Sequence, residues 1–380
     1  MADNKDKKVL NVPALRFPEF SGEWNTSSIE EQFELYSGNT PSRMDKKQFD
    51  GTVNWITSGE LKEHYIADTK EKISDEAVKS NNLKLLPVGT FVIAIYGLEA
   101  DGVRGTCSIT ASESTISQAC MAFISKKDIA NEFLYAWYKK HGNVIGIRYA
   151  QGTKQQNLSY DIIEKFNISY PCIEEQKKLI RFISLIDERI ATQNKIIEKL
   201  ESLIKGIAQN VARNNKPNIR LSECLEYSSS TLQESDVCEN GTYPVYGANG
   251  IVGYIDNYNT EKEAVYIIKD GSGVGTVSYV TGKCSATGTL NTLQAKEGYS
   301  LQYLYYMLKV FNFEPYKTGM AIPHIYFKDY GKAKIFCPSY TEQLKYVELL
   351  SAIDNKLSAE QSILTDLSLQ KQYLLSQMFI

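Results

Sequence analysis

The sequence has little of what most enzymes need for chemistry. Its 380 residues include three histidines, no Pro-Pro pair, no GxSxG and no GxxxxGK[ST] segment. These absences argue against a phosphate-binding loop, a serine nucleophile elbow and an amine methyltransferase with an Asp/Asn-Pro-Pro-aromatic motif. The nearest glycine-rich stretch, GSGVGTVSYV from Gly271, runs into β-branched residues rather than a helix, so it predicts a tight β-hairpin and not a dinucleotide site. A binding protein is therefore favoured over an enzyme.

Signals for metal binding, membranes and secretion are also missing. The seven cysteines form no CxxC pair, which argues against a zinc cluster and predicts reduced thiols that are buried or half-buried. The longest apolar runs, such as FVIAI from Phe91, are far shorter than the roughly 20 residues that span a bilayer. The opening MADNKDKK reads as a polar tail, so we expect a cytoplasmic protein with no membrane partner. The formal net charge of −3 leaves no broadly basic surface, which counts modestly against nucleic-acid binding by the chain alone.

What the chain does contain is an internal repeat. PCIEEQKKLIRFISLIDERI from Pro171 and PSYTEQLKYVELLSAIDNKL from Pro338 align without a gap at an offset of 167 residues. The same offset continues upstream, where YAQGTKQQNLSYDIIEKFNISYP from Tyr149 meets YKTGMAIPHIYFKDYGKAKIFCP from Tyr316. Two amphipathic helices that resemble each other by chance would not keep one offset over this length.

Earlier parts of the two copies keep the order of their features. FVIAIYGLEADGVRGTCSI from Phe91 and AVYIIKDGSGVGTVSYV from Ala264 each place a glycine-rich turn between two β-rich runs. EFLYAWYKK and LQYLYYMLK then predict matching short amphipathic helices. The chain therefore consists of two half-molecules, each a mixed α/β domain followed by a long helix.

Both long helices carry a heptad pattern. Their apolar positions are spaced alternately four and three apart, and the two seams are Leu179, Ile183, Ile186, Ile190, Gln193, Ile197, Leu200, Ile204, Ile207 and Val211, and Tyr346, Leu350, Ile353, Leu357, Glu360, Leu364, Leu367, Lys371, Leu374 and Met378. The simplest way to bury both seams is an antiparallel coiled coil under a pseudo-twofold axis, with a domain at each end. Gln193 and Glu360 occupy one equivalent seam position, where they either set the register or mark a seam that opens to solvent.

The helix starts hold charged residues that could suggest a metal site. Glu175 and Lys177 have the residue types of a carboxylate-and-lysine nuclease motif, but the second copy has Leu344 in place of the lysine. Acidic residues at a helix start also favour the helix macrodipole. We therefore assign these positions a structural role.

The predicted fold is α+β, with two pseudo-symmetric mixed α/β domains and two long helices. We divide the chain into a first domain at 1–170, a central helix at 171–214, a second domain at 215–337 and a C-terminal helix at 338–380. Two similar domains held a fixed distance apart suit a target with two separated parts. Duplex DNA with a split recognition site is the leading example, because reading heads about one turn, roughly 34 Å, apart meet the same DNA face.

The sequence resembles the specificity (S) subunits of Type I restriction-modification systems, the HsdS family. The resemblance rests on ALRFPEFSGEW (from Ala14), SGNTPSR (from Ser37), YPVYGANGIVGYID (from Tyr243), the two Pro-x-x-x-Glu-Gln helix starts and LLSQMF (from Leu374), and it covers essentially the whole chain. It implies two target-recognition domains that each read half of a bipartite site in double-stranded DNA, and a coiled coil that fixes the gap. It also implies a non-catalytic chain without a cofactor of its own. Two methyltransferase (M) subunits would bring S-adenosylmethionine, and restriction (R) subunits would bring ATP and Mg²⁺.

Base readout needs hydrogen-bonding side chains on loops that approach the DNA closely. Polar, glycine-rich loops supply the candidates in the first domain: Ser37, Asn39, Thr40, Ser42, Arg43, Arg104, Gln151, Thr153, Lys154, Gln155, Gln156 and Asn157. Their counterparts in the second domain are Tyr246, Asn249, Lys269, Ser272, Lys317, Thr318 and His324. Any one of them could instead be a turn residue or a phosphate contact. The run GTKQQN and its repeat partner differ in chemistry, as expected of domains that read different half-sites.

Two alternatives from other classes stay open at this stage. One is a standalone enzyme, which detectable methyl transfer by the purified chain alone would support, and we expect none. In the other, the paired domains and coiled coil form a scaffold that binds only protein partners and never contacts DNA. Salt-dependent binding of the assembled complex to duplexes with a gapped site separates this scaffold from a DNA-recognition subunit.

Overall fold

The structure is a computed structural model that describes residues 10–97, 105–126, 128–150, 156–319 and 322–380. Contacts divide the chain into two compact units, residues 1–191 with 365–380, and residues 192–364. The division falls inside both long helices. Each unit therefore holds one mixed α/β domain and a stretch of the helix pair.

The first unit is built on a five-stranded sheet in the order β2-β10-β6-β8-β4. Its strands are β2 (Phe33–Ser37), β10 (Cys120–Ser125), β6 (Phe91–Ala94), β8 (Cys107–Thr110) and β4 (Tyr65–Ile66). Neighbours are antiparallel except β4, which is parallel to β8. A three-stranded sheet in the order β5-β3-β9 accompanies it, formed by β5 (Lys72–Ile73), β3 (Val53–Ile56) and β9 (Ser114–Ile116).

The central strand β6 explains the buried run FVIA. Alternate side chains of a strand point to opposite faces of its sheet. Phe91 and Ile93 join the core that contains helix α3 (Asn131–Tyr149), whereas Val92 and Ala94 join the cluster that contains Ile56 of β3. Both faces of the strand are therefore covered, so the run shows no polar alternation.

Short elements complete the first domain. They are β1 (Asn25–Ser28), α1 (Ile29–Gln32), η1 (Lys46–Phe49), η2 (Ser58–Glu60), α2 (Asp75–Ser80), β7 (Tyr96–Gly97), β11 (Gln156–Asn157), α4 (Tyr160–Ile163) and β12 (Asn167–Tyr170). The pairs β1–β12 and β7–β11 are antiparallel.

The second unit repeats this plan with a four-stranded sheet in the order β14-β20-β17-β18 and a three-stranded sheet in the order β16-β15-β19. The strands are β14 (Leu225–Ser229), β20 (Leu290–Ala295), β17 (Glu263–Ile268), β18 (Val277–Thr281), β16 (Gly250–Ile255), β15 (Tyr243–Gly247) and β19 (Ser285–Ala286). The remaining elements are β13 (Ile219–Arg220), α6 (Leu221–Cys224), η3 (Glu234–Asp236), α7 (Leu301–Lys309), η4 (Glu314–Tyr316), α8 (Phe327–Tyr330) and β21 (Lys334–Ile335).

The repeated plan confirms the predicted internal repeat. β17 is also covered on both faces, because Val265 and Ile267 join the core of α7 while Tyr266 joins the opposite cluster. The glycine-rich stretch after β17 connects it to the antiparallel strand β18, so the hairpin prediction is confirmed. Gly271 and Gly275 lie there at φ values of +95° and +92°, which favour glycine.

The expectation of two matching short helices is wrong for the first copy. α7 has nine residues, but α3 has 19 and continues through HGNVIGIRY. Gly142 lies in this extension, and a Cβ added there would lie 2.6 Å from the Cα of Gly105. Close packing of the helix on that loop, together with burial of Ile145, sustains a segment whose glycines weaken it locally. Local propensity could not reveal this contact.

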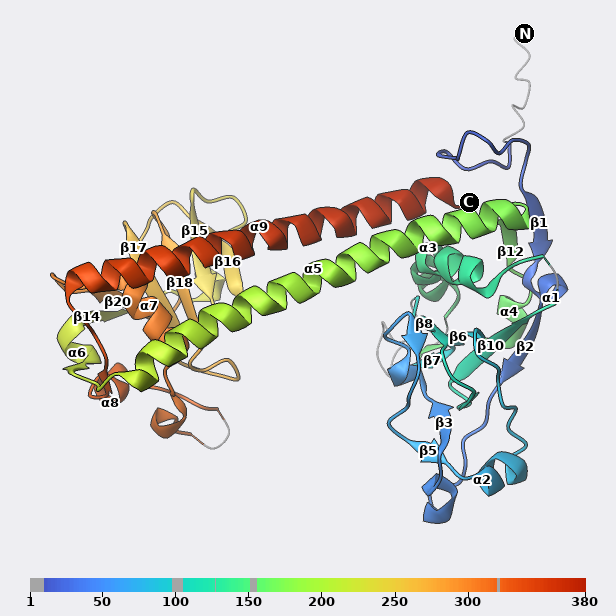
Figure 1. Cartoon of the computed structure of the whole chain (residues 1–380), viewed down its shortest axis with the longest axis horizontal. Helices are drawn as coiled ribbons and strands as arrows, with labels where there is room; N and C mark the ends of the chain where they lie inside the picture. Colours follow the sequence, from blue (N-terminus) through green and yellow to red (C-terminus); the bar gives the residue numbers. More distant parts are fainter. Residues whose placement is uncertain (1–9, 98–104, 127, 151–155, 320–321) are drawn as a thin grey trace, which may run out of the picture. The chain divides into compact units, whose positions relative to one another are not determined.

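The long helices α5 (Ile173–Asn214) and α9 (Tyr340–Met378) are antiparallel partners (Figure 1). In the first unit, Leu179 and Ile183 of early α5 share a core with Leu374 and Met378 of late α9. In the second unit, late α5 and early α9 share the other core. The predicted heptad seam is therefore buried or half-buried along both helices.

The polar seam position is buried as well. Gln193 and Glu360 are 7% and 6% exposed, and the Gln193 amide donates to the Glu360 backbone carbonyl at 3.0 Å and to its carboxylate. Lys356 forms an ion pair with the same carboxylate. The alternative that the seam opens to solvent at this position is therefore wrong.

The repeated Pro-x-x-x-Glu-Gln motif has a structural explanation. The buried Gln176 side chain accepts from the N–H of Ala130, the N-cap of α3, at 3.0 Å and donates to the Pro171 carbonyl at 3.0 Å. In the second copy, Gln343 accepts from the N–H of Ser300, the N-cap of α7, at 2.9 Å, and donates to the carbonyl of Pro338 at 2.9 Å. Each glutamine thus joins a long helix to the helix that covers its sheet.

Glu175 and the N-terminal segment are also explained by packing. Arg16 holds the buried Glu175 carboxylate through Nε at 2.8 Å and a second nitrogen at 2.7 Å, and Phe17 packs edge-on against Phe182. The ALRFPEFSGEW stretch therefore fastens the start of α5, and the structural role predicted for Glu175 is confirmed.

The cysteines follow the prediction in part. All seven are unpaired, and five are buried, but Cys172 and Cys238 are exposed. Burial raises the pKa of the Cys107 thiol to about 11, which keeps it protonated at neutral pH. Among the described residues, no helix is both long enough and apolar enough to cross a membrane.

Candidate nucleic-acid interface

The first group of candidates follows strand β2. Ser37 ends the strand, and Asn39, Ser42 and Arg43 are exposed in the loop beyond it, while Thr40 is half-buried. The side chain of Asn39 accepts from the Thr40 N–H at 2.8 Å, and its backbone carbonyl accepts from the indole of Trp55 at 3.2 Å. The loop is therefore held in one shape while its polar side chains remain accessible.

Arg43 has partners that the sequence did not indicate. Its guanidinium lies 4.8 Å from the ring centre of Phe49 and 5.4 Å from that of Trp55, and it forms a two-point ion pair with Glu71. The hydrogen bond from Arg43 lowers the pKa of the Glu71 carboxyl, so the pair is charged at neutral pH. Arg43 is thus oriented and still exposed, but its charge is partly compensated.

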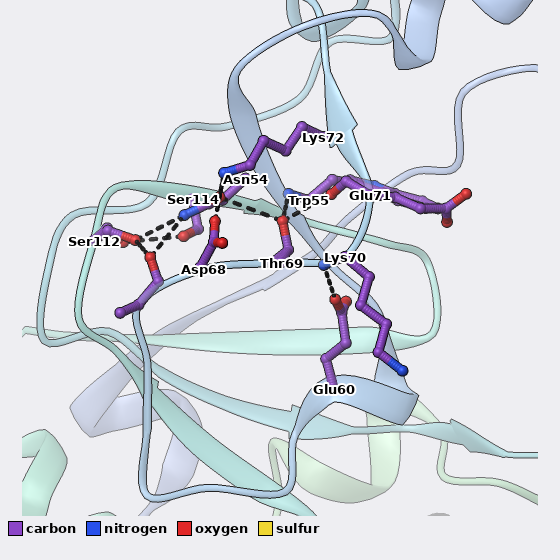
Figure 2. Close-up of polar contacts among 11 residues, drawn as sticks. Asn54, Trp55, Glu60, Asp68, Thr69, Lys70, Glu71, Lys72, Ser112 and Ser114 are labelled. Carbon is purple, nitrogen blue, oxygen red and sulfur yellow. Dashed lines mark hydrogen bonds and ion pairs between the residues drawn. The ribbon is translucent and has the colours of Figure 1, made fainter.

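The segment that carries Glu71 is anchored in turn by a polar network (Figure 2). Thr69 accepts from the Trp55 N–H at 3.2 Å and donates to the Glu71 carbonyl at 2.7 Å. The side-chain oxygen of Asn54, in β3, accepts from Lys72 Nζ at 2.8 Å, and its amide nitrogen donates to the Ser112 hydroxyl at 2.8 Å. The network fixes the loop next to the three-stranded sheet, so it is a frame for Arg43 rather than a second site.

A second group of first-domain candidates lies mostly outside the described residues. These are Arg104, Gln151, Thr153, Lys154 and Gln155. Gln156 and Asn157 are described as strand β11, which pairs with β7 so that Gln156 faces Gly97 and Asn157 faces Tyr96. Asn157 and Ser37 line one open pocket, together with Tyr96 and Tyr160. The structure therefore brings together two candidates that are 120 residues apart in sequence.

In the second domain, five of the seven candidates lie on two loops that meet. Lys269 and Ser272 follow β17, and Lys317, Thr318 and His324 lie on the loop before α8. Backbone bonds join the loops, from the Ile325 N–H to the Lys269 carbonyl at 3.0 Å and from the Gly271 N–H to the Pro323 carbonyl at 3.0 Å.

Side chains reinforce this junction. Nδ1 of His324 lies 2.6 Å from Oδ1 of Asp270, and Thr318 pairs with His324 through two backbone hydrogen bonds of 2.9 and 2.7 Å. Lys317 donates to Glu314 at 2.6 Å and Lys269 donates to Ser229 at 3.0 Å. Lys317 is therefore paired with a carboxylate, whereas Lys269 contacts a neutral hydroxyl, as suits a lysine that contacts phosphate.

The remaining candidates lie on the β15–β16 hairpin. Asn249 is exposed at its turn, whereas Tyr246 is half-buried and packs against Tyr266 at a ring separation of 5.8 Å. Burial raises the pKa of Tyr246. Its packing gives Tyr246 a part in the core that the sequence did not predict.

Sequence reasoning missed three polar or aromatic partners at these loops: Glu71, Tyr96 and Asp270. Each meets its candidate across 28 to 61 residues of sequence, through pairing that no local pattern reveals. The only available signal was positional, because Asp270 sits in the glycine-rich turn that the repeat had already singled out. In the described part of the chain, no group of three or more His, Cys, Asp or Glu residues could hold a metal ion.

Comparison with known proteins gives a consistent result. The family model for the Type I restriction modification DNA specificity domain matches residues 21–202 and 215–368. The MjaIX specificity subunit of Methanocaldococcus jannaschii is 28% identical over 47% of this chain, an alignment that spans only 42% of that subunit. The EcoprrI specificity subunit of Escherichia coli is 22% identical over 85% of each chain.

Solved structures show the same fold. The S subunit of a Type I restriction-modification system from M. genitalium superposes with a TM-score of 0.63 at 19% identity, covering 97% of this chain and 99% of that one. A chain from a structural study of complex assembly and conformational transition of the type I R-M system gives a TM-score of 0.57 at 16% identity, covering 94% of this chain and 97% of that one. The family model covers well over half of the sequence, once in each half, so the chain belongs to the family of Type I restriction-modification DNA specificity subunits.

Proposed function

We propose that this chain is the DNA-recognition subunit of a Type I restriction-modification complex in which each domain reads one half of a bipartite, gapped site. One observation carries the proposal. Equivalent loops on equivalent sheets are joined in the same way in both domains, yet they present different side chains, such as Asn157 in one domain and His324 in the other. A repeated frame with unlike loops suits the recognition of two unlike half-sites.

The helix pair supports the proposed division of labour. Its apolar seam is continuous, and the polar pair Gln193–Glu360 joins equivalent positions of the two copies, as a pseudo-twofold axis at that point requires. A helix pair of this kind can act as a spacer, and we propose that its length sets the gap between the two half-sites.

Two methyltransferase subunits are the proposed partners of the helices. Ile196 and Ile363 occupy equivalent positions and are 37% and 39% exposed, so like apolar contacts are available to two copies of one partner. Restriction subunits then join through the methyltransferases. In this scheme the chain is non-catalytic and holds no cofactor, while S-adenosylmethionine, ATP and Mg²⁺ enter with the partners in the cytoplasm.

The spacer assignment is tested by inserting one heptad at equivalent points of α5 and α9. Seven residues add about 10.5 Å of helix, which equals about three base pairs of duplex. We expect the methylated sites to keep both half-site sequences while the gap grows by about three base pairs. Sequencing of methylated positions in a host that carries the insertion measures this, and a changed half-site with an unchanged gap would contradict the assignment.

DNA binding itself is tested with the assembled complex. Its affinity for a gapped duplex should fall steeply with salt, because phosphate contacts release counterions. Normal assembly with the methyltransferase subunits, but no salt-dependent DNA binding, would instead support a scaffold that binds only protein.

A further inference from the structure

The two loops of each domain meet at equivalent residues. The repeat offset of 167 places Asn157 on His324. In the first domain Asn157 is paired with Tyr96 across β11–β7, and in the second His324 is paired with Asp270 through an isolated antiparallel bridge. The same backbone junction therefore displays Tyr and Asn in one domain and Asp and His in the other.

The neighbouring residues confirm the register of this comparison. Leu158 and Ile325 follow the two loop residues, and both are fully buried. The N–H of Leu158 donates to the carbonyl of Ile95 at 2.8 Å, and the N–H of Ile325 donates to the carbonyl of Lys269 at 3.0 Å. The apolar anchor is common to both copies, whereas the pair beside it, in which Asn157 is exposed and Tyr96, Asp270 and His324 are half-buried, differs in chemistry.

We propose that this bridged pair is a specificity-determining element of each domain: Tyr96 with Asn157 for one half-site, and Asp270 with His324 for the other. The proposal rests on the proposed DNA-recognition function and names a position of contact within it. Tyr96 and Asp270 were not among the candidates drawn from the sequence.

In the second domain the geometry indicates what the pair recognises. The Asp270 carboxylate can only accept, so Nδ1 of His324 carries the hydrogen of their 2.6 Å bond. In the neutral tautomer that has this hydrogen on Nδ1, Nε2 is an acceptor, and the imidazole is 35% exposed. Acceptors match the exocyclic amines of adenine N6 and cytosine N4 in the major groove. Asp270 is thus a positioning residue that sets the hydrogen-bonding character of His324.

The described residues on either side of the pair are held by their backbone geometry. Gly319 has a φ of +89°, and a Cβ added to it would lie 2.3 Å from the carbonyl oxygen of Ile322, so only glycine fits at this position. The Gly271–Pro323 backbone bond closes the other side of the junction. Residues held in this way lose little conformational entropy on binding.

In the first domain the pair Tyr96–Asn157 presents a different set of hydrogen-bonding groups. Asn157 is exposed and shares an open pocket with Tyr96. The asparagine amide carries both a donor and an acceptor, which together match N7 and N6 of adenine. We therefore expect an adenine in the first half-site at the position that Asn157 meets.

The test is the Asp270→Asn substitution in the full chain, assembled with its methyltransferase subunits. Unlike the carboxylate, the amide NH2 of the substituted side chain can donate to Nδ1 of His324; in that arrangement the ring hydrogen lies on Nε2, and this atom is a donor instead of an acceptor. Methylation of a library of gapped duplexes with randomised half-sites should then shift at one position of one half from adenine or cytosine toward guanine or thymine. We expect the preference there to change about tenfold. The other half should not change, and neither half should change with Glu297→Gln, a charge-neutralising control in an exposed turn.

Other outcomes distinguish a failure of the proposed specificity pair from a failure of the proposed DNA-recognition function. If Asp270→Asn and His324→Ala complexes methylate gapped sites with the wild-type preference in both halves, the pair is not a specificity element, although the proposed function stands. If the wild-type complex shows no selection of gapped sites, the proposed function fails. Should the Asp270 variant not assemble, Asn157→Ala carries the test, since an unchanged preference in the first half would overturn the inference.

Discussion

Replacing the buried glutamines at the helix starts tests whether the repeated motif is a structural joint. Methionine keeps the length and volume of glutamine but removes its polar atoms. Gln176→Met leaves the Ala130 N–H and the carbonyls of Asp128 and Pro171 without their side-chain partner. Gln343→Met leaves two groups without their side-chain partner, the Ser300 N–H and the Pro338 carbonyl.

The expected loss follows from the number and burial of these groups. An unpaired buried polar group costs about 1–3 kcal/mol, and less where water can reach it. The Ala130 and Asp128 bonds are only partly buried, whereas the Pro171 bond is buried. We therefore expect the free energy of unfolding to fall by about 2–4 kcal/mol for Gln176→Met and by about 1–3 kcal/mol for Gln343→Met.

Urea unfolding of the full chain, followed by circular dichroism, measures these losses. Hydrogen exchange read by mass spectrometry shows whether Gln176→Met opens the α3–α5 contact and Gln343→Met the α7–α9 contact. Gln370→Met, at an exposed position of α9, is the matched control and should stay within about 0.5 kcal/mol of wild type. Losses no larger than that of the control would refute the assignment of the motif to helix joints.

Two further predictions concern polar pairs. Leucine at Gln193 or Glu360 alone should lower the urea midpoint, because it removes the hydrogen bond between the two side chains and places the remaining polar side chain against leucine in the seam, whereas the double leucine variant should restore it. Purely additive shifts would show that the two side chains do not interact. Because Arg43 lowers the pKa of Glu71, their pair stabilises the fold above the unfolded-state pKa of Glu71 and ceases to do so as the pH falls through the lower folded-state pKa. Stability of the wild type should thus decline more steeply than that of Glu71→Gln between about pH 5 and pH 3, and parallel decline would contradict it.

Much of the architecture of helices and sheets could be predicted, because an element that buries one face or both has a recognisable pattern of apolar residues in the sequence. The seam residues of α5 and α9, the apolar strand β6 and the apolar run that follows Glu263 in β17 each follow from a face that must be covered. The repeat then supplied the pairing, since two equivalent seams bury each other most simply in antiparallel order. The four-part division at 1–170, 171–214, 215–337 and 338–380 stays a prediction, because the contact units cut through the helices instead.

The loops could be predicted only as locations. Composition singled out the turns that hold Arg43 and His324, but their partners Glu71 and Asp270 lie 28 and 54 residues away, where no periodicity connects them. The same limit explains Tyr246, whose ring packs into a cluster formed by β17 and its neighbours. Such contacts depend on tertiary pairing, and a local pattern carries no information about them.

An aspartate that is repeated in both long helices shows that the repeat does not predict every contact, even in the part of the structure that the two copies share. Asp187 and Asp354 are identical at the repeat offset, which would suggest one common contact. Instead, Asp187 accepts from Lys371 at 2.5 Å, whereas Asp354 accepts from the Tyr306 hydroxyl at 3.4 Å. Lys371 is replaced at its own equivalent position by the buried Ile204, so the same carboxylate finds a different donor. Identity between the copies thus places a polar group beside the seam without naming its partner. For loops whose residues differ between the copies, the partner must therefore come from the fold and the recognised base from experiment.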